Sequence, residues 1–170
     1  MSADWYKKLP QNRNFLAPVG FKFTLERFAG VDFFCQAASI PEVSMPVTEV
    51  VTPFRGVPII PGGGVEYADL NLRFVIDEDL VNYMSVWNWI RDNGNADSFE
   101  GEGQGYSSGR LEILTSNFVT KYIVNYERLI PVSLSAIPFD TSVNDIEFFT
   151  ANVTFKYTKY SILDLSFNPL

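Results

Sequence analysis

The chain has 170 residues, of which 46% are hydrophobic and 15% aromatic, and its formal net charge is −7. This apolar content excludes a disordered chain, and the length fits one domain, residues 1–170, with a sizeable core. There is no histidine and Cys35 is the sole cysteine, which excludes Ser-His-Asp and Cys-His catalysis and any internal disulfide, so we expect no enzyme and no cofactor or metal.

The N-terminal segment, residues 1–18, is mostly polar and is expected to form an arm. It lacks the apolar stretch of a signal peptide. No apolar run in the chain approaches the ~20 residues that cross a bilayer. We therefore expect a protein that is made in the cytoplasm and has no membrane span.

Alternation of apolar and polar residues predicts an early pair of strands. Phe21, Phe23 and Leu25 share one face of the first strand, and the pattern resumes from Val31 to Cys35. Ala29-Gly30 supplies a turn, so the two strands are expected to form a β-hairpin. Cys35 falls on the apolar face, where we expect a small buried hydrophobe.

Residues 42–64 are rich in proline and end in three consecutive glycines. Their scattered apolar side chains predict an extended excursion that docks on its own barrel or on a neighbouring subunit. The glycines do not predict a phosphate cradle, because a strand pattern through Leu70, Leu72 and Phe74 follows them in place of a helix. The residues expected to contact a neighbouring subunit are Phe54, Val57, Ile59 and Ile60, together with Tyr106 from a later loop.

One helix is predicted over residues 78–92. Asp77 is its expected N-cap and Gly94 its expected C′ residue. An apolar stripe at helical spacing is expected to pack on a sheet, and it consists of Leu80, Tyr83, Met84, Trp87 and Ile90. Residues 94–109 are glycine-rich and predict a solvated loop that contacts a neighbour.

The rest of the chain reads as strands. They are expected over residues 110–115, over residues 118–130 with a break at Pro131, and over residues 151–157. With the earlier segments, this predicts a mainly β domain with a single helix.

Several motifs, in order, resemble the tail tube proteins of contractile bacteriophages. The carriers of the likeness, which spans about residues 19–160, are Phe33-Phe34-Cys35-Gln36-Ala37-Ala38-Ser39-Ile40-Pro41, Trp87-Asn88-Trp89, Tyr126-Glu127-Arg128-Leu129-Ile130-Pro131 and the turn from Asp140 to Asn144. The proline-rich stretch over residues 46–61 and the tail over residues 161–170 are longer than the family pattern. These departures leave open a main tube subunit or a ring protein at one end of the tube.

The resemblance implies a β-sandwich or small barrel flanked by a helix, with strands that extend into an inter-subunit barrel. It implies stacked rings of six copies in the virion tail, a sheath outside, and baseplate and neck or terminator proteins at the ends; tailocin and type VI secretion tubes share the fold. Genomic DNA would pass through the lumen without specific binding, and acidic residues there would repel its phosphates. The polar residues expected to face the lumen are Glu26, Asn71, Asn152 and Thr154.

Three alternatives stay open. The chain could initiate or terminate a tube instead of forming its length. It could be a carbohydrate-binding β-sandwich that stacks sugars on Trp5, Trp87 or Trp89. A hydrolase using Glu100 and Glu102 is the least favoured, because neighbours on a loop do not hold the fixed separation of glycosidase carboxylates.

Overall fold

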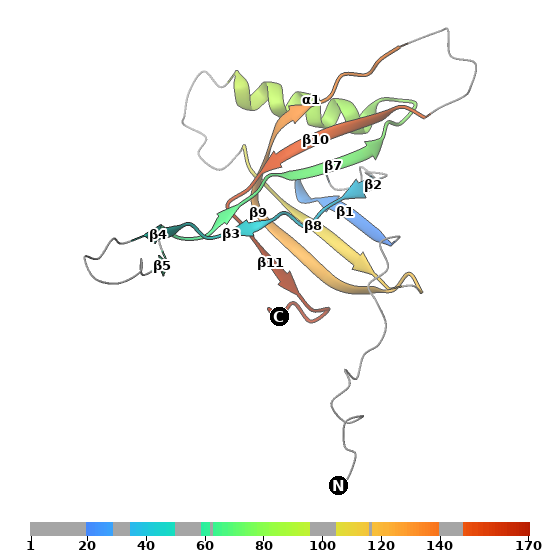
Figure 1. The fold of residues 1–170 in the computed structure, drawn as a ribbon. Helices are drawn as coiled ribbons and strands as arrows, with labels where there is room; N and C mark the ends of the chain where they lie inside the picture. Colours follow the sequence, from blue (N-terminus) through green and yellow to red (C-terminus); the bar gives the residue numbers. More distant parts are fainter. Residues whose placement is uncertain are drawn as a thin grey trace.

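A computed structural model describes residues 20–28, 35–49, 59–61, 63–95, 105–115, 117–139 and 148–170. Its main feature is a seven-stranded antiparallel sheet in the order β1-β8-β9-β10-β7-β2 (Figure 1). The seventh strand, β11, pairs with β9 on the side opposite β8. The strands of this sheet are β1 (Phe21–Leu25), β2 (Cys35–Ala38), β7 (Leu70–Val75), β8 (Ser107–Leu114), β9 (Thr120–Leu134), β10 (Thr150–Lys156) and β11 (Lys159–Leu163). The predicted mainly β domain with one helix is confirmed.

The sheet folds over a core between two halves. We call β1, β8, the first part of β9, and β11 the first half-sheet, and the end of β9 with β10, β7 and β2 the second half-sheet. Phe23 of the first half lies 6.2 Å from Phe155 of the second, centroid to centroid. The predicted alternation holds in β1, β7 and β10, whose apolar residues point into this core. No ladder joins β1 to β2 in the described residues, so the sheet is an open sandwich there.

Strand β9 passes from one half-sheet to the other. A register shift against β8 lies between Ser107 and Gly109, and Arg128 opposite it has a left-handed backbone, with φ 55°. Such a bulge bends a strand and increases its twist. The expected break at Pro131 is wrong, since β9 continues to Leu134. Pro131 is tolerated because it pairs with Phe155 at a second register shift, where the ladder is already irregular.

The predicted hairpin of residues 21–36 is also wrong. In the described residues β1 pairs with β8, and β2 pairs with β7. A short 3-10 turn, η2 (Glu26–Phe28), ends β1. Alternation identified β1, whereas residues 31–34 of the second predicted strand lie outside the described residues. The pattern carries no information on which strand pairs with which.

Helix α1 (Val81–Gly94) begins three residues later than expected. Asp77 is not its N-cap, because Leu80 occupies that position with φ 58° and Asp77 instead accepts the Leu80 N–H in a turn. Gly94 is the last helical residue and not C′. The side chain of Asn82 donates to the Val75 carbonyl oxygen at 2.8 Å, which ties the helix start to β7.

The buried face of α1 differs from the predicted stripe. Asn82, Val86 and Trp89 are fully buried, whereas Leu80, Met84 and Trp87 are exposed. Tyr83 and Ile90 flank the buried face. Trp89 packs 5.6 Å from Phe28 and 6.1 Å from Phe155 between ring centroids, and its indole N–H donates to the Gly105 carbonyl oxygen at 2.7 Å.

The C-terminal tail forms structure that the sequence pattern did not predict. Strand β11 pairs with β9, and the chain then folds back so that the Leu170 N–H donates to the Ile162 carbonyl oxygen. The Asp164 carboxylate holds this turn by accepting the backbone N–H groups of Asn168 and Ser166, at 2.9 and 2.8 Å. These bonds lower the pKa of Asp164. The tail thus covers the outer side of β11.

A cluster of tyrosines fixes the base of the excursion. The ring centroids of Tyr157 and Tyr160 lie 5.2 to 6.1 Å from each other and from those of Tyr67 and Tyr126. Tyr157 donates to the Ala68 carbonyl oxygen and Tyr160 to that of Pro41, at either side of the excursion. The Tyr126 hydroxyl is buried and has no hydrogen-bond partner among the described residues. Burial raises the pKa of Tyr126 and brings that of Tyr157 to about 12.

Tyr126→Phe is expected to leave the free energy of unfolding unchanged or to raise it by about 1 kcal/mol, because it removes a buried hydroxyl that lacks a partner. The matched control is Tyr83→Phe, whose hydroxyl donates to the Ser135 carbonyl oxygen at 3.1 Å. That change should lower the free energy of unfolding by about 1 kcal/mol. Urea denaturation at equal protein concentration measures both, and a larger loss in Tyr126→Phe than in Tyr83→Phe would contradict the assignment.

Candidate assembly interface

The second half-sheet has an unpaired strand edge at each end in the described residues. Strand β2 bonds to β7, and within the described ranges no ladder lies on its other side. Residues Ile130 to Leu134 of β9 bond to β10 on one side, while the ladders to β8 and β11 lie at or before Leu129. Among the described residues, no ladder occupies the other side of either segment. A strand edge with free N–H and C=O groups is a template for pairing with another chain.

The outer face of the second half-sheet is polar. Three of the four predicted lumen residues meet there: Asn71 lies opposite Thr154, and Asn152 lies opposite Arg73. The Thr154 hydroxyl donates to the Asn71 side-chain oxygen at 2.8 Å. The fourth residue, Glu26, lies in η2 and forms an ion pair with Arg110 at 3.1 Å. The structure therefore separates Glu26 from the other three.

The excursion forms two short ribbons that project from the body (Figure 1). Strand β3 (Val43–Ser44) pairs with β6 (Glu66–Tyr67), and β4 (Val47–Glu49) pairs with β5 (Ile59–Pro61). Val43, Met45 and Val47 are 49%, 52% and 54% exposed. In the described part, the excursion thus presents apolar side chains to solvent.

The predicted contact residues lie in different regions. Phe54 and Val57 fall outside the described residues, as do the N-terminal arm, the turn from Asp140 to Asn144, Trp5, Glu100 and Glu102. Ile59 and Ile60 are in β5, where only the backbone is described. Tyr106 lies just before β8 and is 40% exposed.

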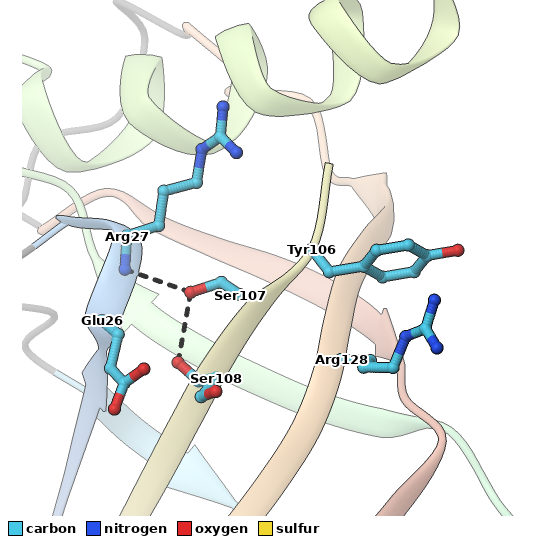
Figure 2. A pocket seen from close by; sticks show the side chains of 6 residues that line it. All are labelled: Glu26, Arg27, Tyr106, Ser107, Ser108 and Arg128. Carbon is cyan, nitrogen blue, oxygen red and sulfur yellow. Dashed lines mark hydrogen bonds between the residues drawn. The ribbon is translucent and has the colours of Figure 1, made fainter. Parts of the chain in front are cut away.

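Tyr106 lines an open pocket of about 400 Å³ (Figure 2). The other lining residues are Glu26, Arg27, Ser107, Ser108 and Arg128. The Arg128 guanidinium lies 4.6 Å from the centre of the Tyr106 ring, a cation–π contact. The Ser107 hydroxyl is used within the wall, because it accepts the Arg27 backbone N–H at 3.0 Å and donates to the Ser108 carbonyl oxygen at 3.2 Å. The Arg128 guanidinium is thus held beside an aromatic ring at the mouth of this pocket.

Sequence reasoning missed Arg128 and the free segment of β9. The motif from Tyr126 to Pro131 predicts a regular strand, in which Arg128 has no special place. A bulge leaves no reliable mark on a pattern of alternating residues, so only the structure shows that Arg128 stands at the bend.

The described tryptophans do not form a sugar platform. Trp89 is 1% exposed and belongs to the core, so it is not available for stacking. Trp87 is exposed, and the Arg91 guanidinium lies 5.0 Å from its ring centre. Within the described residues, no helix has both the length and the apolarity that a membrane span requires.

The phage tail tube protein family matches residues 8–163 of the chain. The tail tube terminator protein of Enterobacteria phage T4 is 30% identical over 117 residues, which are 66% of this chain and 62% of that protein. The alignment thus spans less than two thirds of this relative's length.

Solved structures share the fold at low sequence identity. A chain of the sheath–tube complex of an extracellular contractile injection system (PVC) has a TM-score of 0.69 at 13% identity, covering 97% of this chain and 99% of that chain. A chain of the sheath/tube terminator structure of that system has a TM-score of 0.68 at 14% identity, covering 89% and 99%.

Fold and sequence together define a structural protein of the tail tube class. The chain belongs to the phage tail tube protein family. It is accordingly a structural component of a phage tail and not an enzyme.

The Cys35 thiol is expected to react slowly with Ellman's reagent. Burial raises its pKa from 9.0 to about 12, so at pH 8 the reactive thiolate is roughly a thousandfold scarcer than in the unfolded chain. Since the folded pKa is the higher one, the thiol's contribution to stability is full below pH 9 and is lost as pH rises toward 12. A fast native reaction, matching that of the exposed variant Asn71→Cys in a Cys35→Ala background, would contradict this environment.

Proposed function

We propose that the chain forms rings of six copies in a contractile phage tail tube, with the second half-sheet of each copy joined to the next in a closed inner barrel. The observation that carries this proposal is the pair of free strand edges at the two ends of that half-sheet. Closing a ring pairs every such edge and leaves none exposed.

The strand directions fit such a ring. Each neighbouring pair in the second half-sheet is antiparallel, so β2 runs opposite to β9 across four strands. Rotation about a ring axis keeps that direction, and β2 of one copy therefore meets β9 of the next in antiparallel orientation. This geometry needs no change of strand direction between copies.

The polar face of the second half-sheet would line the channel. Asn71, Asn152 and Thr154 are neutral, the Lys156 amine is 3.6 Å from the Asp69 carboxylate, and Arg73 is exposed with no ion pair in the described part of the chain. One isolated arginine per copy is not a dense array of cations, so genomic DNA would pass without specific binding. The sheath would surround the rings, and baseplate and neck proteins would bind their ends.

A terminator ring is the second candidate function. It is favoured by the likeness to the phage T4 tail tube terminator, whereas the two injection-system structures match almost equally well. Negative-stain electron microscopy of the concentrated protein tests both candidates. Long hollow tubes indicate a main tube subunit, single rings indicate a terminator or initiator, and a persistent monomer would refute ring assembly itself.

Val132→Lys is expected to raise the protein concentration needed for ring formation at least about tenfold. It places a charge in the free segment of β9, where lysine opposes strand pairing. Val81→Lys, at a residue 50% exposed on α1, adds the same charge away from the proposed edge and serves as the control. Analytical ultracentrifugation measures assembly, and circular dichroism confirms that both monomers fold. Equal assembly by the two variants would count against the β9 edge.

A further inference from the structure

Arg128 is a cation without a carboxylate partner in the described residues. It lines the open pocket beside Tyr106 and lies at the bend of β9. The only carboxylate that lines the pocket, that of Glu26, is already paired with Arg110. Arg27 also lines the pocket, and its guanidinium lies 5.5 Å from the centre of the Trp89 ring. Arg128 is thus a positive group at an open pocket on a chain whose net charge is −7.

The backbone at Arg128 is costly for this residue type. A non-glycine residue with φ 55° is strained, and glycine would adopt the same conformation at lower cost. Strained residues of this kind cluster at functional sites. The conformation turns an arginine side chain toward the pocket immediately before the free segment of β9.

The strand directions of the proposed ring specify what approaches this pocket. In antiparallel pairing, residues after β2 advance along the next copy toward lower numbers in β9. If Cys35 to Ala38 lie beside Ile130 to Leu134, then the chain near Glu42 arrives beside Arg128. Glu42 is exposed, and its backbone carbonyl oxygen accepts the Ala68 N–H at 3.0 Å, which holds this segment in place. Its carboxylate has no ion pair within the described part of the chain.

We propose that the Tyr106–Arg128 pocket receives the Glu42 carboxylate of the adjacent copy, so that an ion pair between subunits fixes the register of the ring. This inference rests on the proposed ring assembly. The stacked Tyr106 ring limits the motion of the guanidinium, which is a planar donor suited to a carboxylate. The pair also offsets the mutual repulsion of acidic copies at their contact.

A charge exchange tests the pair directly. Arg128→Glu and Glu42→Arg should each raise the concentration needed for ring formation at least about tenfold, because each places like charges together. The double variant Arg128→Glu/Glu42→Arg should return to within about threefold of the original protein. Arg91→Glu is the matched control: Arg91 also contacts an aromatic ring and is exposed, but it lies on α1. It should assemble normally.

Disulfide trapping provides a second measurement that does not depend on the charge variants. In a Cys35→Ala background, Glu42→Cys/Arg128→Cys should give a ladder of covalent oligomers under oxidation, visible on a non-reducing gel. Glu42→Cys/Arg91→Cys should give none.

The outcomes separate this inference from the proposed function. Rescue in the double variant, or the covalent ladder if Arg128→Glu fails to fold, supports the pair. Rings that form equally well in Arg128→Glu, Glu42→Arg and Arg91→Glu overturn the ion pair and leave the proposed ring assembly intact. The same conclusion follows if the single variants lose ring formation, the double variant does not restore it and no covalent oligomers form. An original protein that stays monomeric at high concentration overturns both.

Discussion

The structure depends on one strand that belongs to two half-sheets. β9 bonds to β8 and β11 along its first part and to β10 along its last part, and the bulge opposite Ser107 and Gly109 makes the turn between them. Without that bend the core residues of the two halves would not face each other. In the described residues, the same bend also leaves the end of β9 without a ladder on its second side, and this is the edge that the proposed ring would use.

In the proposed ring, assembly by strand edges would decide which interactions hold the copies together. Backbone hydrogen bonds gain little individually, since water already satisfies the free groups, but they are directional and fix the strands in register. Specificity then has to come from side chains at the boundary. In this chain the candidates are the apolar residues of the excursion, such as Met45 and Val47, and the charged groups around the bend of β9.

The sequence predicted element types better than their partners. Period-two alternation located β1, β7 and β10 with their buried faces, because half-buried strands produce that pattern directly. It failed on pairing, on the passage of β9 through Pro131 and on the phase of α1, where Asn82 is buried and Trp87 exposed. Those outcomes depend on contacts between distant segments. Alternation placed Asn71, Asn152 and Thr154 on one polar face, and their place in a lumen stays a prediction, whereas Arg128 depends on a bulge that the pattern does not encode.

The C-terminal tail has a consequence for the pool of newly made chains. Its fold-back over β11, pinned by Asp164, insulates one border of the first half-sheet. Unwanted association through that edge would first require the C-terminal segment to detach from β11, which places a kinetic barrier on aggregation. In a concentrated solution of unassembled subunits, this cover would disfavour association through β11.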